Sequence, residues 1–326
     1  MFNEYGGTLH LEKIDLKNNP YLKYDCMKLS SGRLAIYMAV KDYNATILYL
    51  PLYICPSVKK YLLSNGIKVK EYNLDNNFMP LVETLNKDEM ILWVNYFGCM
   101  FSEIKDKVID KYKNQLILDN SQALFDVPIY EADNYFVYSC RKFFGIPDGA
   151  ILVKKNIKKE NEFLLTNNYD TSKWGYLLEA SKHGSNYVYN KYLENEESFC
   201  NRYDKMSFIT EQYLNAINWD KVKAIRKENF NILHNNLFSK NDLNIDFNTE
   251  TPFMYPFYNT NENLRSKLLE NNIFVPTIWK HVISSLYANE NEKKWAKYII
   301  PITIDQRYNS SDMLYITKFI KQVLKE

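Results

Sequence analysis

Three short segments carry residue types that could bind a phosphate, hold a cation and attack a carbonyl group. The first is residues 29–35, where Ser31, Gly32 and Arg33 stand at the start of an expected helix. A helix N-terminus offers free N–H groups and the positive end of the helix dipole, so it can bind a phosphate. Serine is also an ordinary helix cap. Taken alone, the segment leaves both interpretations open.

The second segment places an acidic residue directly after an apolar stretch. Asp119 follows residues 116–118, Leu-Ile-Leu, which are expected to form a buried strand. Ligands of open parallel sheets gather at the carboxyl ends of the strands. An ionised aspartate there needs a cationic partner, such as a protonated ring nitrogen. The alternative is an aspartate that caps the following turn.

The third segment contains a lysine among aromatic residues, a proline and two glycines. Lys142 follows the expected strand 135–139 and precedes Phe143 and Phe144. A lysine becomes nucleophilic when it is desolvated or lies near another cation, because its pKa falls. Arg141 could supply that cation. Because lysines are abundant in this chain, a surface lysine in a turn is the alternative.

The pattern of apolar residues predicts the elements that position these segments. Strands that alternate with helices predict a layered α/β fold with mainly parallel pairing, closing on an antiparallel pair. A long amphipathic helix at residues 219–237 begins a second, smaller α/β domain. We therefore expect a large domain at residues 1–220, with an N-terminal arm, and a small one at 221–326. The expected strands are 45–50, 68–74, 90–97, 115–119, 135–139, 150–154, 252–258, 273–275 and 298–304, and the expected helices include 56–65, 103–112, 264–269 and one from Ser310 with Leu314 facing inward.

Composition excludes several classes of protein. The 326 residues are 46% apolar and 25% charged, which is ordinary globular usage, and the net charge of +2 gives no field that would attract nucleic acid. No apolar run is long enough to cross a membrane, and no signal peptide is visible. The five cysteines are widely spaced and no Cys-x-x-Cys occurs, so neither a disulfide framework nor a metal site is expected. We expect a reducing, cytoplasmic setting.

The order and spacing of the three segments resemble the fold-type I pyridoxal-phosphate enzymes, most closely the DegT/DnrJ/EryC1/StrS family of sugar aminotransferases. The resemblance runs from about residue 28 to the C-terminus and is strongest over residues 29–150. It implies a three-layer large domain, a small C-terminal domain and pyridoxal 5′-phosphate as cofactor. The residues that it implies as cofactor ligands are Ser31, Gly32, Arg33, Tyr53, Tyr96, Asp119, Gln122, Ser139 and Lys142.

The resemblance also implies roles for single residues. Asp119 would pair with the pyridine nitrogen, Gln122 would approach the ring, and Ser139 would hold the phosphate. Lys142 would bind the cofactor covalently and act as the catalytic acid and base. The ring would be stacked by an aromatic side chain, with Tyr53, Tyr96 and Phe97 left as alternatives. The chain departs from the family at Arg33, which replaces a small hydroxyl residue, and at Cys55, where many relatives have an aromatic ring.

The implied function is transfer of an amino group from glutamate to a nucleotide-linked keto-sugar, for a surface polysaccharide, by a homodimer. Two alternatives stay open: another pyridoxal-phosphate reaction on a small carbonyl or sugar, and a non-catalytic ligand-binding protein on the same fold. Arg226 and Arg265 fall on helix faces expected to meet solvent. That leaves Arg307 as the arginine that could bind a substrate carboxylate.

Overall fold

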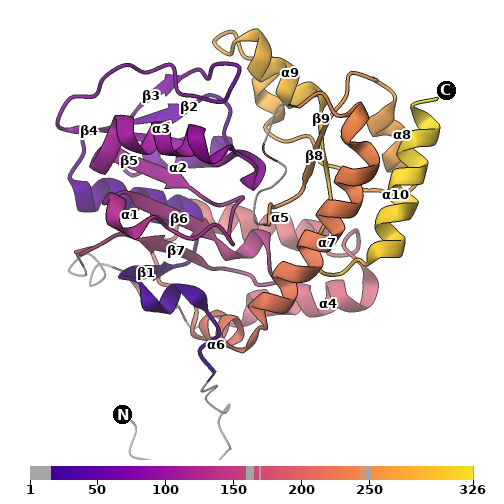
Figure 1. Ribbon diagram of the computed structural model, residues 1–326. Helices are drawn as coiled ribbons and strands as arrows, with labels where there is room; N and C mark the ends of the chain where they lie inside the picture. Colours follow the sequence, from indigo (N-terminus) through magenta and orange to yellow (C-terminus); the bar gives the residue numbers. More distant parts are fainter. Residues whose placement is uncertain (1–15, 159–164, 169, 244–245, 247–250, 326) are drawn as a thin grey trace, which may run out of the picture.

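A seven-stranded sheet forms the centre of the computed structural model, which describes residues 16–158, 165–168, 170–243, 246 and 251–325 (Figure 1). The strand order is β1-β7-β6-β5-β4-β2-β3, and only β7 runs against its neighbours. The expected α/β class, mainly parallel pairing and final antiparallel pair are therefore confirmed. The strands are β1 (Cys26–Leu29), β2 (Ile47–Pro51), β3 (Lys68–Tyr72), β4 (Glu89–Val94), β5 (Leu116–Asp119), β6 (Tyr135–Ser139) and β7 (Ala150–Val153).

The central strands are buried along their whole length, because helices cover the sheet on both faces. Every residue of β4, β5, β6 and β7 is buried, as expected of strands between two helical layers. Helix α1 packs against β6 and β7, and α2 packs against α1 and β3. The helices that alternate with these strands are α1 (Gly32–Tyr43), α2 (Pro56–Ser64) and α3 (Ser102–Tyr112).

Parallel pairing brings four chain segments to one edge of the sheet. Strands β2, β4, β5 and β6 pair in parallel, so the residues that follow them lie at the same carboxyl edge. Strand β1 also ends there, next to the antiparallel β7, and it leads directly into α1. The start of α1, Asp119 and the segment with Lys142 are therefore neighbours in space.

A second sheet of two antiparallel strands and four helices makes up the C-terminal part. Helix α7 packs on α10 and on β8, and we propose that the boundary between the two domains falls at the start of α7. These elements lie beside the large sheet in Figure 1. They are α7 (Trp219–Leu237), β8 (Tyr255–Tyr258), α8 (Leu264–Glu270), α9 (Glu290–Tyr298), β9 (Ile299–Ile302) and α10 (Ser310–Val323).

Two expectations for the C-terminal part are wrong. Residues 273–275 are not a strand, because β8 and β9 pair with each other and leave this segment without a partner strand. Helix α10 is capped by Asn309, whose side chain accepts from the N–H groups of Ser311 and Asp312. Its buried face contains Met313 instead of the exposed Leu314.

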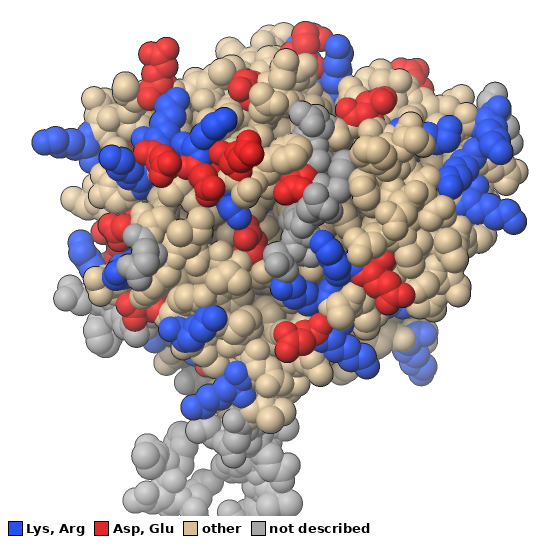
Figure 2. Space-filling view, viewed as in Figure 1, with Lys and Arg blue, Asp and Glu red and all other residues tan. Residues whose placement is uncertain are grey.

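The middle of the chain forms three helices, α4 (Gly175–His183), α5 (Tyr189–Ser198) and α6 (Phe208–Ala216). The ribbon places α5 between the large sheet and the C-terminal part (Figure 1). Basic and acidic side chains are interspersed on the face shown in Figure 2. No helix in the described ranges is both long enough and apolar enough to span a membrane.

Candidate active site

A cavity of about 190 Å³ opens at the carboxyl edge of the large sheet. It brings together the three segments that sequence analysis singled out, which are far apart along the chain. Helix α5 and the C-terminal part complete its wall. The predicted site residues that line it are Ser31, Gly32, Arg33, Asp119, Gln122, Ser139 and Lys142.

The start of α1 forms one end of this cavity. Ser31 is the N-cap, and its Oγ accepts a hydrogen bond of 3.4 Å from the N–H of Leu34. The N–H groups of Gly32 and Arg33 precede the first intrahelical bond, so the helix itself offers them no acceptor. A Cβ atom on Gly32 would lie 3.5 Å from Ser121 Oγ and 3.9 Å from Ser139 Cβ. The glycine thus leaves open the space between these two serines, which a side chain at position 32 would enter.

The end of β5 supplies a buried carboxylate. Asp119 is 6% exposed, and its Oδ1 accepts a 2.9 Å hydrogen bond from the Ser121 N–H. Gln122 lies one turn further on, and its side-chain oxygen accepts from the Phe97 N–H at 2.6 Å. That bond ties the loop after β5 to the loop after β4 and fixes the position of Gln122 at the cavity wall.

Lys142 reaches the cavity from a short 3₁₀ helix, Cys140–Lys142, that follows β6. Its side chain is exposed, and no hydrogen bond or ion pair of its amine occurs among the described residues. The amine lies over the ring of Phe253, 6.0 Å from the ring centre. The amine is therefore free to react with a carbonyl group that enters the cavity.

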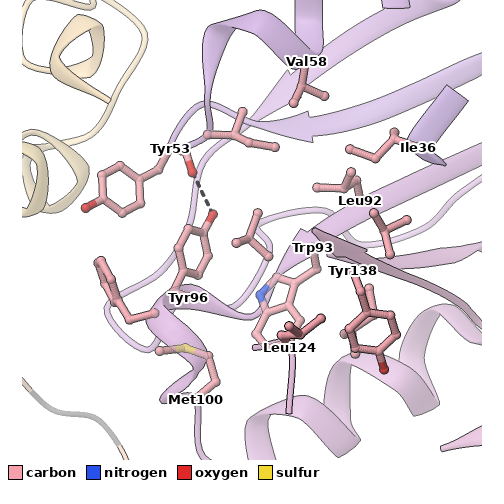
Figure 3. Close-up of a cluster of buried hydrophobic side chains, with 14 of the residues drawn as sticks. Ile36, Tyr53, Val58, Leu92, Trp93, Tyr96, Met100, Leu124 and Tyr138 are labelled. Atoms are coloured by element: carbon pink, nitrogen blue, oxygen red, sulfur yellow. Dashed lines mark hydrogen bonds between the residues drawn. The ribbon is translucent and has the colours of Figure 1, made fainter. Parts of the chain in front are cut away.

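Tyr53 and Tyr96 are fully buried and are not among the cavity-lining residues. They stack on each other, and the Tyr96 hydroxyl donates to the Tyr53 backbone oxygen at 3.0 Å (Figure 3). Trp279 from the C-terminal part lines the cavity in front of them, with its ring centre 4.4 Å from that of Tyr53. Ile54 and Val94 add apolar surface to the same wall.

A second, larger cavity of about 620 Å³ also includes Lys142 and is lined mainly by the C-terminal part. Arg226 borders it, although sequence analysis placed this arginine on a solvent face. Its side chain is 1% exposed and donates to Gln306 Oε1 at 3.0 Å and to the Phe253 carbonyl at 2.7 Å. Burial lowers the pKa of Arg226 to about 10. Arg307, at the same cavity, is held by Asp305 through two contacts of 2.8 Å.

The sequence matches no protein-family model and no curated protein. Its structure, in contrast, is similar to solved aminotransferases. The sugar aminotransferase CalS13 of Micromonospora echinospora is 12% identical, with a TM-score of 0.62 over 91% of this chain and 87% of its own. A DegT DnrJ EryC1 StrS aminotransferase of Brucella abortus is 10% identical, with a TM-score of 0.58 over 94% and 87%. NtdA of Bacillus subtilis, solved with the cofactor PMP bound, is 11% identical, with a TM-score of 0.65 over 94% and 75%.

The chain has the fold-type I pyridoxal-phosphate transferase fold. At these identities the likeness establishes the fold, and the expected three-layer large domain with a small C-terminal α/β part is confirmed. Two of these structural neighbours are described as a sugar aminotransferase and as a DegT DnrJ EryC1 StrS aminotransferase.

Sequence analysis missed some residues that line the first cavity. Arg141 was considered only as a neighbour that could lower the pKa of Lys142, yet its own side chain reaches the cavity wall. Tyr192 and Glu196 come from α5, and Trp279 from the C-terminal part. Only the folded chain brings these last three to the sheet edge, and no local motif marks them. The described residues contain no cluster of His, Cys, Asp and Glu placed to hold a metal ion.

Proposed function

We propose that the chain is a pyridoxal-phosphate-dependent aminotransferase of the DegT/DnrJ/EryC1/StrS type, acting on a keto-sugar. The observation that carries this proposal is the shared cavity. An accessible amine, a buried carboxylate and an open space at a helix N-terminus meet in it, on a fold that solved sugar aminotransferases share. Each of the three groups matches one part of the cofactor: the aldehyde, the ring nitrogen and the phosphate.

Three features of this chain fit the cofactor. The Lys142 amine has no described partner, so nothing competes with a covalent bond to an aldehyde. The space kept open by Gly32 lies between Ser121 and Ser139, whose hydroxyls can donate to phosphate oxygens. The buried Nε of Arg141 lacks a hydrogen-bond partner in the described structure. A buried donor of this kind is costly unless an acceptor arrives.

Each of these residues then has its own proposed role. The cofactor, when bound, supplies a ring that accepts an electron pair from the substrate carbon. Asp119 keeps a proton on the ring nitrogen, because a nearby carboxylate stabilises a cation. Lys142 would hold the cofactor through its amine and would move the proton to and from the substrate carbon as acid and base. Ser31, Ser139 and the first N–H groups of α1 would contribute donors to the phosphate.

We propose Trp279 as the aromatic side chain that contacts the ring. It lines the cavity itself, whereas Tyr53 and Tyr96 touch it from behind, with ring centres 4.4 and 5.7 Å from that of Trp279. The backbone of Trp279 has a φ of 54°. A bulky residue adopts this conformation only when its surroundings hold it there, and such strain gathers at functional sites. In this arrangement the two tyrosines position the tryptophan.

The second cavity supports a sugar as the amino acceptor. It opens from Lys142 and presents asparagine and tyrosine side chains, which form hydrogen bonds with hydroxyl groups. Its neutral donors include those of Asn186, Asn271, Asn272, Tyr189 and Tyr308. We propose glutamate as the amino donor and a nucleotide-linked keto-sugar for a surface polysaccharide as the acceptor. The five cysteines are free, which is compatible with the proposed cytoplasmic setting.

The decisive experiment locates the cofactor. Purified protein is incubated with pyridoxal phosphate, reduced with borohydride and digested, and the labelled peptide is identified by mass spectrometry. We expect a yellow protein and a label on Lys142. Lys142→Ala should abolish both the colour and amino transfer, while Lys60→Ala, which removes an exposed lysine of α2, should change neither. A label on another lysine, or no label, would refute the proposal.

The substrate class has its own test. Binding stabilises a folded protein in proportion to the logarithm of ligand excess over Kd, so a substrate raises the melting temperature. The cofactor-loaded protein is melted with nucleotide keto-sugars and, separately, with dicarboxylic and aromatic amino acids, and amino transfer from glutamate is assayed against the same sugars. If only small amino or keto acids stabilise the protein and are turned over, the substrate is a small acid and the sugar proposal is wrong.

A further inference from the structure

Two arginines and one glutamate meet at the end of the first cavity that contains the start of α1. Arg33 is the second residue of α1, and Arg141 immediately precedes Lys142. Glu196 of α5 contacts both: its Oε2 lies 3.3 Å from Arg33 Nη2, and its Oε1 accepts from Arg141 Nη2. All three side chains line the cavity together with Ser31 and Ser139.

The two guanidinium groups are held in place by more than this ion pair. Their side chains are 11% and 13% exposed. Both lie against the buried ring of Phe199, with their Cζ atoms 5.8 and 4.5 Å from its centre. Such cation–π contacts orient a guanidinium and limit its motion. One carboxylate between two arginines also relieves their mutual repulsion, so Glu196 can fix both at once.

The contacts with Glu196 take up only part of the hydrogen-bonding capacity of these arginines. Each guanidinium has five N–H donors in a planar fork, and one nitrogen of each contacts Glu196. The Nε of Arg141 is buried without a partner in the described structure. Two arginines against one carboxylate leave one net positive charge beside the positive end of α1. A dianionic phosphate complements that surplus.

We propose that Arg33 and Arg141 bind the phosphate of the cofactor, and that Glu196 is a positioning residue that holds the two guanidinium groups toward it. This inference rests on the proposed function and goes beyond it, because it assigns the phosphate mainly to a pair of arginines. Arg33 stands where the resembling family has a small hydroxyl residue, and the inference gives this arginine a role in binding the phosphate. Helix α5 becomes part of the cofactor site although none of its residues needs to touch the cofactor.

The test compares two ligands that differ only in the phosphate. Full-length protein freed of cofactor is titrated with pyridoxal phosphate and with pyridoxal, and binding is followed by absorbance and by intrinsic fluorescence. We expect Arg141→Met and Arg33→Met to weaken pyridoxal-phosphate binding by about ten- to a hundredfold, as for the loss of charge-assisted hydrogen bonds. Binding of pyridoxal should change far less, because the variants leave Lys142 and Asp119 in place.

Lys173→Met is the matched control. The Lys173 amine also lies over the Phe199 ring, at 5.5 Å, but it does not line the cavity. This variant should keep the preference of the wild type for pyridoxal phosphate over pyridoxal. Circular dichroism and melting curves of all variants separate a local loss from unfolding.

The outcomes separate the inference from the proposed function. Wild-type protein that binds neither ligand refutes both. Wild-type protein that binds pyridoxal phosphate at Lys142, with an unchanged preference in the folded arginine variants, refutes only the arginine assignment. Glu196→Gln should weaken pyridoxal-phosphate binding by about three- to tenfold, because the amide keeps one acceptor but loses the charge. Tighter binding in that variant would show that Glu196 competes with the phosphate, and would overturn its positioning role.

Discussion

At the scale of single residues, Asp119 gives the clearest indication of a bound cationic group. Its carboxylate is buried at the end of β5, with the Ser121 N–H as its hydrogen-bond donor. No lysine, arginine or histidine forms an ion pair with it within the described ranges. Burying an uncompensated charge is costly, so a cationic ligand group would be stabilised here. A protonated pyridine nitrogen has the required charge.

We predict that Asp119→Asn leaves the fold intact and largely abolishes amino transfer. Asparagine has nearly the same shape but no charge, so it cannot keep the ring nitrogen protonated. Loss of the charge-assisted pair should also weaken cofactor binding by about tenfold or more. The measurements are turnover and a cofactor titration, with Asp106→Asn on the exposed face of α3 as control. Near-normal turnover in Asp119→Asn would contradict the role given to this residue.

The sequence predicts the polar site residues better than the aromatic ones. Asp119 ends a predicted strand and Lys142 closely follows another, so the parallel pairing of β5 with β6 brings them to one edge. Ser31 begins a predicted helix, and it reaches that edge through β1 and the antiparallel β7. Glu196 and Trp279 lie on elements that the sequence does not place against the sheet edge. Whether a loop side chain faces the cavity or the core depends on backbone angles that composition does not reveal.

At the scale of elements, the sequence predicts the bounds of strongly periodic helices and strands well. It predicts short or half-exposed elements poorly. Strand β6 and helix α7 match their expected ranges at both ends. Strand β1, with four residues and alternating partial burial, was not predicted at all, because it has no continuous apolar run. The false strand at 273–275 has apolar residues but no neighbour that could accept its hydrogen bonds.

The loop after β4 is an element that the cavity depends on. Phe97 and Gly98 have φ angles of 60° and 74°, and the turn brings Gly98 against Gln122 of the next loop. A Cβ atom on Gly98 would lie 2.5 Å from the Gln122 carbonyl oxygen and 3.1 Å from Pro252 Cα. Only glycine permits this approach. The same junction holds Gln122 at the cavity wall through the Phe97 N–H.

We therefore predict that Gly98→Ala destabilises the protein by about 2–4 kcal/mol, the sum of a backbone penalty and an overpacking penalty. Gly66→Ala is the matched control: its φ is 80°, but a Cβ there would meet no atom within 4 Å. The control should lose only about 1 kcal/mol, from the backbone conformation alone. Urea unfolding of the two variants provides the comparison. Equal losses would show that the Gly98 contact relaxes without cost.

At the scale of the whole molecule, buried polar contacts connect the large sheet with the C-terminal part, and both parts contribute residues to the cavities. Glu292 of α9 accepts from the Asn73 side chain at 2.7 Å and from the Leu74 N–H at 3.1 Å. It also forms the capping box of its own helix with Asn289. Burial raises the pKa of Glu292. These bonds fix α9, and hence the segment with Trp279, relative to the loop after β3.

The segment around α4 and α5 presents an apolar surface that a single chain leaves uncovered. Its exposed side chains include Leu178, which is 70% exposed, and Tyr187, Tyr189 and Leu193. Clustered exposed apolar side chains mark an interaction surface more often than a free one. Helix α5 also lines both cavities, through Tyr192 and Glu196 in the first and Tyr189 in the second. A partner bound to this segment would therefore stand beside the active site.

We predict a symmetric homodimer, or a multiple of it, that uses this segment as part of its interface. Leu178→Glu should shift the protein toward monomers in light scattering, because a buried charge without a partner opposes association. Turnover should fall with it, since α5 would lose the contacts that hold Glu196 and Tyr192 at the cavity. Leu286→Glu, at a leucine that is 92% exposed and lies outside the segment, should change neither property. A monomeric wild-type protein with full activity would show instead that one chain completes the site alone.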